Sequence, residues 1–279
     1  MATSRSIGAI LVDAGRLSPG DAERVLRLSR EKNIRFGDAA LELRLITEAD
    51  ISFALSRQFD YICLPPGDKS VSRDVVAAFS LNSRALEGLR ALRTQLMLRW
   101  FAAEQERKAL AIVSSRRKDG RSWIAANLAV VFSQLGERTL LIDADMRHPV
   151  QHEHFHLDNR AGLSALLSGR GGDELIRRVE SLQGLSVLPA GVSPPNAQEL
   201  ISRPAFGQLV SHLSSQFDVI LVDTPPASEF ADAQAVAAST RGALMVARRH
   251  HTSTKELREA AEFIAQTGAS IVGSAMNEF

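Results

Sequence analysis

The stretch from Ser114 to Trp123 reads SSRRKDGRSW and places a glycine, an arginine and a serine side by side at positions 120–122. It follows an apolar run, ALAIV, and precedes a segment of helical character, IAANLAVVFSQLG. A loop between a strand and a helix points several backbone N–H groups at an anion, and the helix dipole adds to the attraction. The residue types and their position therefore predict a phosphate-binding loop.

This loop departs from the usual GxxxxGK[ST] pattern at two of the four fixed positions. Ser115 holds the first glycine position and Arg121 holds the lysine position, whereas Gly120 and Ser122 keep the expected residue types. An arginine neutralises phosphates and grips them with two N–H groups, but its planar fork is bulkier than an ammonium. Two interpretations stay open: a working loop with an unusual cation, and a loop that no longer binds nucleotide.

Carboxylates end two further apolar runs of the chain. LLIDADMR places Asp143 and Asp145 two residues apart, which puts both side chains on one face of a strand, and VILVDTPP places Asp223 at the end of another. Ligands of open α/β sheets bind beyond the carboxyl ends of the strands. Together with Ser122, these carboxylates offer the oxygen ligands that Mg²⁺ prefers, so the four residues are a predicted magnesium site.

The elements that must position these residues alternate along the chain from Ala109 onward. Helical patterns separate most of six strand-like runs, which read ALAIVSS, RTLLIDAD, LSVLPAG, FDVILVDTPP, GALMVAR and ASIVGSAM. Near-continuous apolar strands that alternate with helices are typical of a parallel sheet with both faces covered. We therefore predict an α/β fold with a mostly parallel sheet and helices on both faces, preceded by a small all-helical repeat domain.

The helical domain is predicted from an internal repeat near the start of the chain. IGAILVDAGRLSPGDAERVLRL and FGDAALELRLITEADISFALSR align with each other, and each predicts a short helix, a turn and a second helix. Ser18 and Thr47 lie where a hydroxyl caps the second helix. The predicted organisation is a helical module at residues 1–61, a linker rich in proline and glycine at 62–82, and a larger domain at 83–279.

The composition is that of a globular protein of a reducing compartment. Of the 279 residues, 45% are hydrophobic and 23% are charged, and the formal net charge is only +1, so no nucleic-acid partner is expected. A single cysteine excludes an internal disulfide framework. The start of the chain is too polar for a secretory signal, and no apolar run approaches the roughly 20 residues of a membrane span. We expect a cytoplasmic protein that a partner recruits to the inner face of the membrane.

The loop, LLIDADMRHPVQHEHF and VILVDTPP together resemble the Walker A, Walker A′ and Walker B motifs of bacterial tyrosine kinases. These P-loop kinases are associated with chain-length determination in exopolysaccharide and capsule export. Glu87, Arg90 and Arg93 match that family's ExxRxxR element, which is linked to ring-like self-association. From about Ser83 to Phe279, the resemblance implies a MinD/ParA-like P-loop fold, the cofactors ATP and Mg²⁺, a homo-oligomer, and a membrane polysaccharide chain-length regulator as activating partner.

The resemblance also implies roles for individual residues. The implied nucleotide-binding residues are Ser115, Gly120, Arg121, Ser122 and Asn277, the last as an adenine contact. The implied catalytic residues are Arg121, Asp143 and Asp145, and the implied magnesium ligands are Ser122, Asp143, Asp145 and Asp223. Arg147 completes the A′ motif. Phosphoryl transfer relies on positioning and charge stabilisation, which groups of these types provide.

The chain departs from the family pattern at its C-terminus. Family kinases usually end in a tail with several tyrosines, whereas this chain ends at MNEF and contains one tyrosine, Tyr61. A cycle of tail autophosphorylation is therefore not expected. The alternatives are a kinase that acts on other proteins, an ATP-dependent assembly switch, a catalytically silent regulatory subunit, and a spatial-positioning ATPase, in which Arg116 would stand for the signature lysine.

The repeated N-terminal module resembles the N-terminal domain of type II secretion and pilus ATPases. Some members of that domain family bind cyclic di-GMP through two tandem motifs, and the second repeat matches at Arg35, Gly37 and Gln58. The first repeat matches less well, since Ser6 and Ser29 replace the arginine and the glutamine. Two interpretations remain: a cyclic di-GMP site, and a docking module without a small ligand.

Overall fold

The computed structural model describes residues 6–58, 63–65, 67–104 and 106–278, and the chain divides into two compact units. The first unit extends to Asp68 and includes Ala78–Leu81, and the second contains Lys69–Ala77 and the chain from Asn82 onward. Tyr61 lies outside the described residues. Among the described residues, no helix combines the length and the apolar character needed to cross a bilayer.

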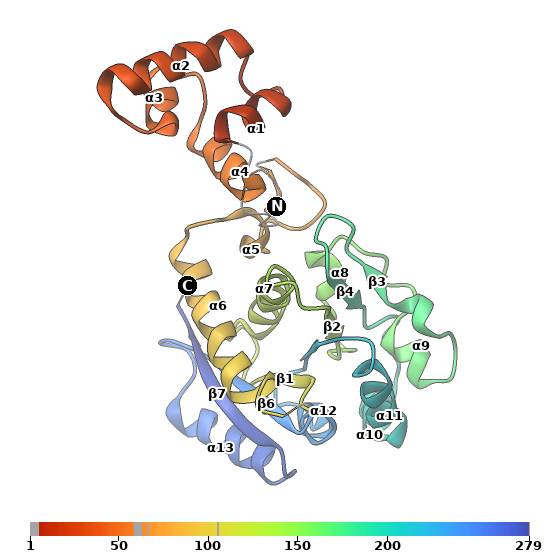
Figure 1. Ribbon diagram of the computed structural model, residues 1–279. Coiled ribbons are helices and arrows are strands. Elements are labelled where there is room, and N and C mark those ends of the chain that lie inside the picture. Colours follow the sequence, from red (N-terminus) through yellow and green to blue (C-terminus); the bar gives the residue numbers. More distant parts are fainter. Residues whose placement is uncertain (1–5, 59–62, 66, 105, 279) are drawn as a thin grey trace. The chain divides into compact units, whose positions relative to one another are not determined.

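The first unit is built from the two predicted helix–turn–helix repeats (Figure 1). The Ser18 hydroxyl accepts a hydrogen bond from the Asp21 N–H at 3.1 Å, and the Thr47 hydroxyl accepts one from the Asp50 N–H at 3.3 Å. Both predicted caps are therefore confirmed. The helices are α1 (Ile7–Asp13), α2 (Pro19–Lys32), α3 (Phe36–Glu42) and α4 (Glu48–Gln58).

The second unit contains a seven-stranded sheet with the order β3-β4-β2-β5-β1-β6-β7. The strands are β1 (Ala109–Ser114), β2 (Thr139–Asp143), β3 (Arg177–Arg178), β4 (Leu185–Leu188), β5 (Val219–Asp223), β6 (Gly242–Arg248) and β7 (Ser270–Asn277). Every neighbouring pair is parallel except β3 with β4. Each of the six predicted runs contains one strand, so the predicted α/β fold with a mostly parallel sheet is confirmed. The short antiparallel strand β3 was not predicted, because two exposed arginines carry no strand pattern.

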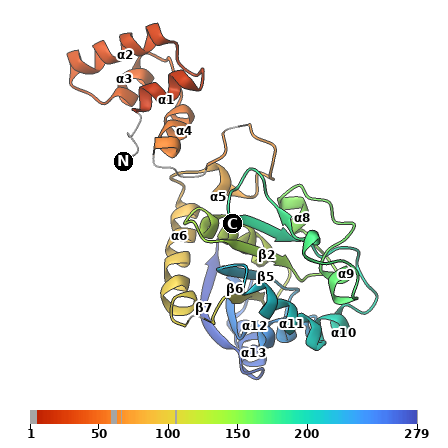
Figure 2. The same cartoon turned by 45° about the vertical axis from the view of Figure 1, so that its right-hand side comes forward.

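Helices cover both faces of the sheet (Figure 2). α6 packs on α7 on one side, and α9 to α13 contribute to a core on the other side. A short π-helical turn, Met97–Phe101, follows α6 directly, and a 3-10 turn occupies Asp173–Leu175. The helices are α5 (Val76–Phe79), α6 (Arg84–Leu96), α7 (Arg121–Ser133), α8 (Gln151–His154), α9 (Leu163–Leu167), α10 (Ala197–Ser202), α11 (Pro204–Leu213), α12 (Asp232–Thr240) and α13 (Thr254–Ala265).

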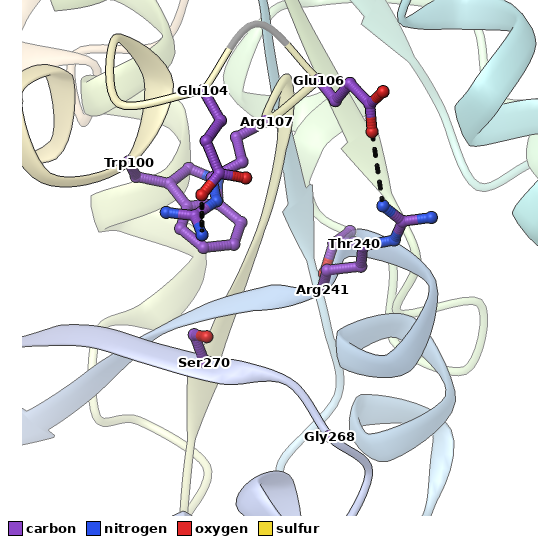
Figure 3. A pocket seen from close by; sticks show the side chains of 8 residues that line it. All are labelled: Trp100, Glu104, Glu106, Arg107, Thr240, Arg241, Gly268 and Ser270. Carbon is purple, nitrogen blue, oxygen red and sulfur yellow. Dashed lines mark ion pairs between the residues drawn. The ribbon is translucent and has the colours of Figure 1, made fainter.

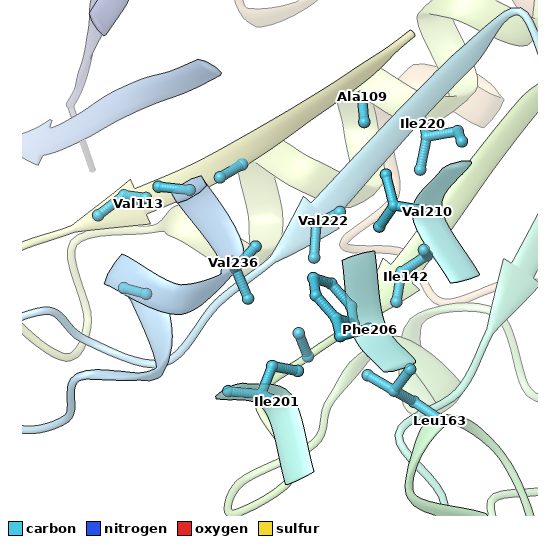
Figure 4. Close-up of a cluster of buried hydrophobic side chains, with 14 of the residues drawn as sticks. Ala109, Val113, Ile142, Leu163, Ile201, Phe206, Val210, Ile220, Val222 and Val236 are labelled. Atoms are coloured by element: carbon cyan, nitrogen blue, oxygen red, sulfur yellow. The ribbon is translucent and has the colours of Figure 1, made fainter. Parts of the chain in front are cut away.

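The central strands β1, β2 and β5 are apolar on both faces because both faces are covered. Ile142 and Val222 belong to the core cluster that also contains Phe206 of α11 and Val236 of α12 (Figure 4). Residues of the same strands that point the other way are equally buried, as Leu141 shows. This two-sided burial explains why the sequence shows continuous apolar runs rather than alternation.

Part of the segment predicted as a linker packs against the second unit. The buried side chain of Asn127 in α7 accepts a hydrogen bond from the Ala77 N–H at 2.9 Å and donates one to the Asp74 carbonyl at 3.0 Å. The Ser72 N–H donates to the His154 carbonyl at 2.8 Å. These long-range bonds fix residues 69–77 within the unit, whereas the proline and glycine signals of the predicted linker lie just before this segment, at residues 65–67.

A small cavity of about 190 Å³ lies at the amino ends of β1, β6 and β7, opposite the carboxyl ends where ligands of such sheets bind (Figure 3). Trp100 forms one wall, and its indole N–H donates to the Ala109 carbonyl at 3.0 Å. The guanidinium of Arg107 lies 4.7 Å from the centre of the Trp100 ring. The buried indole is therefore held on several sides, and a Cβ on Gly242 would lie 2.3 Å from its Cζ2 atom.

We expect Gly242→Ala to lower the free energy of unfolding by about 2 kcal/mol, because the added methyl group overpacks a fixed, buried ring. Urea denaturation followed by tryptophan fluorescence measures the effect. Gly273→Ala is the matched control in the same sheet, since nothing lies within 4 Å of its added Cβ. Equal costs for the two variants would contradict the role assigned to Trp100.

Candidate functional site

The strand order brings the predicted site residues to one edge of the sheet. β5 lies between β1 and β2, and the register pairs Asp143 of β2 directly with Asp223 of β5. Asp223 also pairs with Ile112, two residues before β1 ends at Ser114. The loop that follows β1 therefore starts beside both carboxylates, as the general rule for open α/β sheets requires.

The loop turns into α7 through two residues with left-handed backbone conformations. Lys118 has a φ of 66° and Gly120, the N-cap of α7, has a φ of 87°. Only glycine adopts the second conformation without strain, which explains Gly120 at this position. α7 then begins at Arg121, and eleven of its thirteen residues are buried, so the helix that presents its N-terminus to the loop is fixed in the core.

A buried carboxylate inside the loop was missed by the sequence analysis. Asp119 is fully buried, and its side chain accepts hydrogen bonds from the Arg116 N–H at 2.9 Å, from His251 Nδ1 at 2.9 Å and from the Thr252 hydroxyl at 2.7 Å. It ties the loop to the turn after β6. Nothing in the local spacing signals this link, because His251 and Thr252 lie 132 and 133 residues away in the sequence.

Asn277, predicted as an adenine contact, also holds the loop. Its side-chain amide donates to the Asp119 carbonyl at 3.3 Å, and the residue is almost fully buried. A groove of about 700 Å³ has Asn277 in its wall, together with Trp123 of α7 and residues of α6 and β7. The structure thus places the predicted base contact next to the loop.

Arg121 is buried and its guanidinium points at carboxylates. Nε donates to Asp223 Oδ1 at 2.9 Å, and Nη2 lies 3.3 Å from Asp145 Oδ2. Nη1 donates to the Ser114 hydroxyl at 3.2 Å, and Nη2 lies 3.4 Å from the Ser122 hydroxyl. The side chain is 8% exposed, so the ion pairs are shielded from water. The predicted phosphate-binding cation is bound by the protein itself.

The remaining carboxylate oxygens accept hydrogen bonds from the segment that follows β2. Asp143 accepts from the Asp145 N–H at 3.2 Å, from the Val150 N–H at 3.0 Å and from the Gln151 N–H at 2.9 Å. Asp145 accepts from the His148 N–H at 3.0 Å. Both side chains are thereby oriented by the backbone.

Burial is the largest influence on the pKa of the Asp143 and Asp145 carboxyl groups. Burial raises the pKa of Asp143 well above its usual range, and the charge of Asp223 raises it further, while the N–H groups of Gln151 and Val150 oppose the shift. Burial also raises the pKa of Asp145, against the opposing charge of Arg121. The buried cluster contains three carboxyl groups and one guanidinium, so it is short of positive charge.

Gln151 is a second site residue that the sequence analysis missed. Its side-chain amide donates to Asp223 Oδ2 at 2.7 Å and to the Ser122 carbonyl at 3.1 Å. The residue is fully buried at the start of α8. The available signal was its place in HPVQ, which continues the A′ motif, but an uncharged glutamine by itself does not indicate a phosphate or metal site.

The predicted magnesium ligands supply oxygen atoms of the right chemical type, but these atoms are not arranged around a space for the metal. Asp223 gives one oxygen to Arg121 and the other to Gln151, and Asp145 gives one oxygen to Arg121 and the other to the His148 N–H. Among the described residues, no group of three or more His, Cys, Asp or Glu side chains is arranged to hold a metal ion. As folded, the carboxylates do not fit Mg²⁺, because a guanidinium and N–H groups take their oxygens.

The remaining predicted site residues lie elsewhere on the second unit. Glu87 and Arg90 form an ion pair on α6, and Arg93 donates to the Val131 carbonyl of α7 at 3.0 Å. Arg93 therefore also docks α6 on α7, which makes Arg90 the cleaner probe of self-association. Arg147 lies 3.4 Å from Asp232 and stays outside the Arg121 cluster.

The predicted cyclic di-GMP residues belong to the first unit. Arg35 is the N-cap of α3, Gly37 lies in α3, and Gln58 ends α4. A Cβ on Gly37 would lie 3.1 Å from the Ile51 Cδ1 atom, so close helix packing is a sufficient reason for a glycine there. Binding of cyclic di-GMP stays a prediction.

Comparison with known proteins assigns the second unit to a family. The family model ParA, described as NUBPL iron-transfer P-loop NTPase, matches residues 105–278. The chain is 34% identical over 192 residues to the putative tyrosine-protein kinase CapB of Staphylococcus aureus, which covers 69% of this chain and 83% of CapB. It is 36% identical over 193 residues to the tyrosine-protein kinase wzc of Salmonella typhi, but covers only 27% of that longer protein.

Solved structures agree with this assignment. The chimerical protein CapA2B2 has a TM-score of 0.68 at 32% identity, over 80% of this chain and 96% of that chain. The kinase domain of the Escherichia coli tyrosine kinase ETK has a TM-score of 0.66 at 33% identity, over 70% of this chain and 75% of that chain. A MinD of Pyrococcus horikoshii, complexed with Mg-ADP, shares the fold at a TM-score of 0.54, 20% identity and coverage of 61% and 70%.

Proposed function

The chain belongs to the bacterial tyrosine-kinase family of P-loop NTPases, and on that premise we propose that it binds ATP at residues 115–122. We further propose that it acts with a membrane polysaccharide chain-length regulator in exopolysaccharide synthesis or export, with phosphoryl transfer to protein tyrosine as its chemistry. One observation carries the nucleotide proposal. The loop after β1 ends in a buried helix N-terminus beside the carboxyl ends of β2 and β5.

The proposed roles follow from the positions of the side chains. The backbone from Ser115 to Gly120 and the N-terminus of α7 receive the phosphates, and Asn277 lies on the side of the base. Arg121 supplies the positive charge. Asp145 is the carboxylate that we assign to the attacking hydroxyl, because it is 4% exposed, whereas Asp143 and Asp223 are fully buried. No step is assigned to Mg²⁺, since three of its four predicted ligands, Ser122, Asp145 and Asp223, contact Arg121.

A second candidate function is a catalytically silent regulatory subunit. The observation that favours it is the capture of Arg121 by Asp223 and Asp145, which removes the cation and the carboxylates from a substrate at the same time. A phosphotyrosine blot after incubation with ATP and the regulator's cytoplasmic segment separates the two functions. New phosphotyrosine supports the kinase, and ATP binding without phosphotyrosine supports the silent subunit.

Calorimetric titration with ATP tests the nucleotide site. We expect Gly120→Ala to weaken binding at least tenfold, because a side chain at a φ of 87° displaces the loop N–H groups from the phosphates. Gly136→Ala is the matched control: it imposes a similar backbone strain at a φ of 95° beyond the other end of α7. An equal loss of affinity in both variants, or no binding by the unaltered protein, would contradict the proposed site.

A further inference from the structure

The contacts of Arg121 coincide with the predicted magnesium ligands. Its guanidinium reaches Asp223 at 2.9 Å, Asp145 at 3.3 Å and Ser122 at 3.4 Å. These are three of the four residues whose oxygens were predicted to surround the metal. A cation of the protein therefore lies among the oxygens that a divalent cation would otherwise share.

The shape of the arginine side chain explains why it takes this position. A guanidinium carries five N–H donors in a rigid fork, so Nε and Nη2 reach two different carboxylates at once. A lysine at position 121 would present one compact ammonium and could not hold the same two distances. The change from lysine to arginine thus alters the partners available to Asp145 and Asp223.

The surrounding residues support Arg121 in this position rather than leaving it to a ligand. Ser114 accepts a fourth guanidinium bond, from Nη1 at 3.2 Å, and Gln151 donates to the second oxygen of Asp223 at 2.7 Å. With the side chain 8% exposed and Asp223 fully buried, the pairs lie in a region of low dielectric constant. A bridging cation is needed there, because adjacent buried carboxylates repel each other.

We propose that the Arg121 guanidinium replaces the divalent cation of this site, so that the folded chain neither needs nor binds Mg²⁺ among Asp143, Asp145 and Asp223. Removal of the guanidinium opens the carboxylates to Mg²⁺. The statement that Arg121 replaces the divalent cation applies to the folded protein without nucleotide. The nucleotide part rests on the proposed function: nucleotide binds to the unaltered protein equally well with and without Mg²⁺.

The test is the melting temperature of the full chain, with and without MgCl₂, at ionic strength matched with KCl. The unaltered protein is expected to show no shift with Mg²⁺. Arg121→Ala is expected to melt roughly 10 °C lower in EDTA, because buried carboxylates lose their counter-charge. Mg²⁺ at about ten times its dissociation constant is expected to restore roughly 4 °C of that loss.

Two further variants keep the test decisive. Arg117→Ala removes an arginine of the same loop that pairs with Glu229 at the surface, and it is expected to respond to Mg²⁺ as the unaltered protein does. If Arg121→Ala does not fold, Arg121→Lys replaces it, and a Mg²⁺-dependent rise in melting temperature is expected there too. An equal Mg²⁺ shift in the unaltered protein, or no shift in either Arg121 variant, would overturn the inference.

Calorimetric titration with ADP, in EDTA and in MgCl₂, distinguishes this inference from the proposed function. The unaltered protein is expected to change its affinity less than about threefold with Mg²⁺, whereas Arg121→Lys is expected to gain at least about tenfold, or 1.4 kcal/mol. A strong Mg²⁺ dependence in the unaltered protein would overturn the inference and leave the nucleotide site intact. Absence of ADP binding in both buffers would refute the nucleotide site, and the melting experiment would still decide the cation inference.

Discussion

Replacement of Asp223 by alanine is expected to lower the free energy of unfolding by about 3–5 kcal/mol, the range for one partner removed from a buried ion pair. Asp223 is fully buried and accepts bonds from Arg121 and from Gln151. Its loss leaves a guanidinium in the core with only Asp145 as a charged partner. The cost is therefore that of a buried guanidinium with one charged partner fewer, added to one N–H group of Gln151 that loses its acceptor.

Urea denaturation of the full chain measures this effect. Asp158→Ala is the control, since Asp158 also pairs with an arginine, but Arg160 is 91% exposed and exposed pairs contribute about 0–1 kcal/mol. Asp223→Asn is a second variant, which preserves the volume and keeps one oxygen for a donor. The assigned role of Asp223 is wrong if Asp223→Ala costs no more than Asp158→Ala.

Asp119→Ala is expected to cost about 3 kcal/mol of stability and to weaken nucleotide binding at least tenfold. The fully buried carboxylate accepts hydrogen bonds from the Arg116 N–H, His251 and Thr252. Its removal deprives these three donors of this acceptor. The loop then loses its link to the turn after β6. Because the loop N–H groups must converge on the phosphates, a loosened loop binds them less well.

A double-mutant cycle separates the link between Asp119 and the turn after β6 from general damage to the fold. Thr252→Val removes one of the donors at nearly constant volume, and Asp119→Ala combined with Thr252→Val should show a coupling of at least about 1 kcal/mol. Calorimetric titration of the same proteins with ATP reports the loop. Additive costs, or unchanged affinity in Asp119→Ala, would show that Asp119 does not position the loop.

The sequence was sufficient for the features that depend on neighbours along the chain. Ser18 and Thr47 were predicted as caps because a cap and the N–H group that it binds lie three residues apart. The parallel strands were predictable because strands buried on both faces show continuous apolar runs. β3 escaped prediction, since its two exposed residues pair through one edge and carry no periodicity.

The sequence also predicted which residues reach the carboxyl edge of the sheet, and several of them do lie together there. Asp143 and Asp223 end neighbouring strands, and Ser122 and Arg121 begin the helix beside them. Their roles in binding nucleotide and metal remain predictions. The sequence could not predict which groups these side chains form hydrogen bonds and ion pairs with.

Tertiary structure alone decided those partners. Arg121 meets Asp223 across 102 residues of sequence, and Asp119 meets Thr252 across 133. A motif fixes which groups reach the edge of a sheet, because local backbone geometry determines where each strand and helix ends. The bonds formed there depend on which other buried charges the strand order brings within hydrogen-bonding distance, and on the need to satisfy every polar group that is removed from water. For this protein, the sequence determined that a guanidinium and three carboxylates lie near one loop, and the fold determined that the guanidinium binds two of those carboxylates.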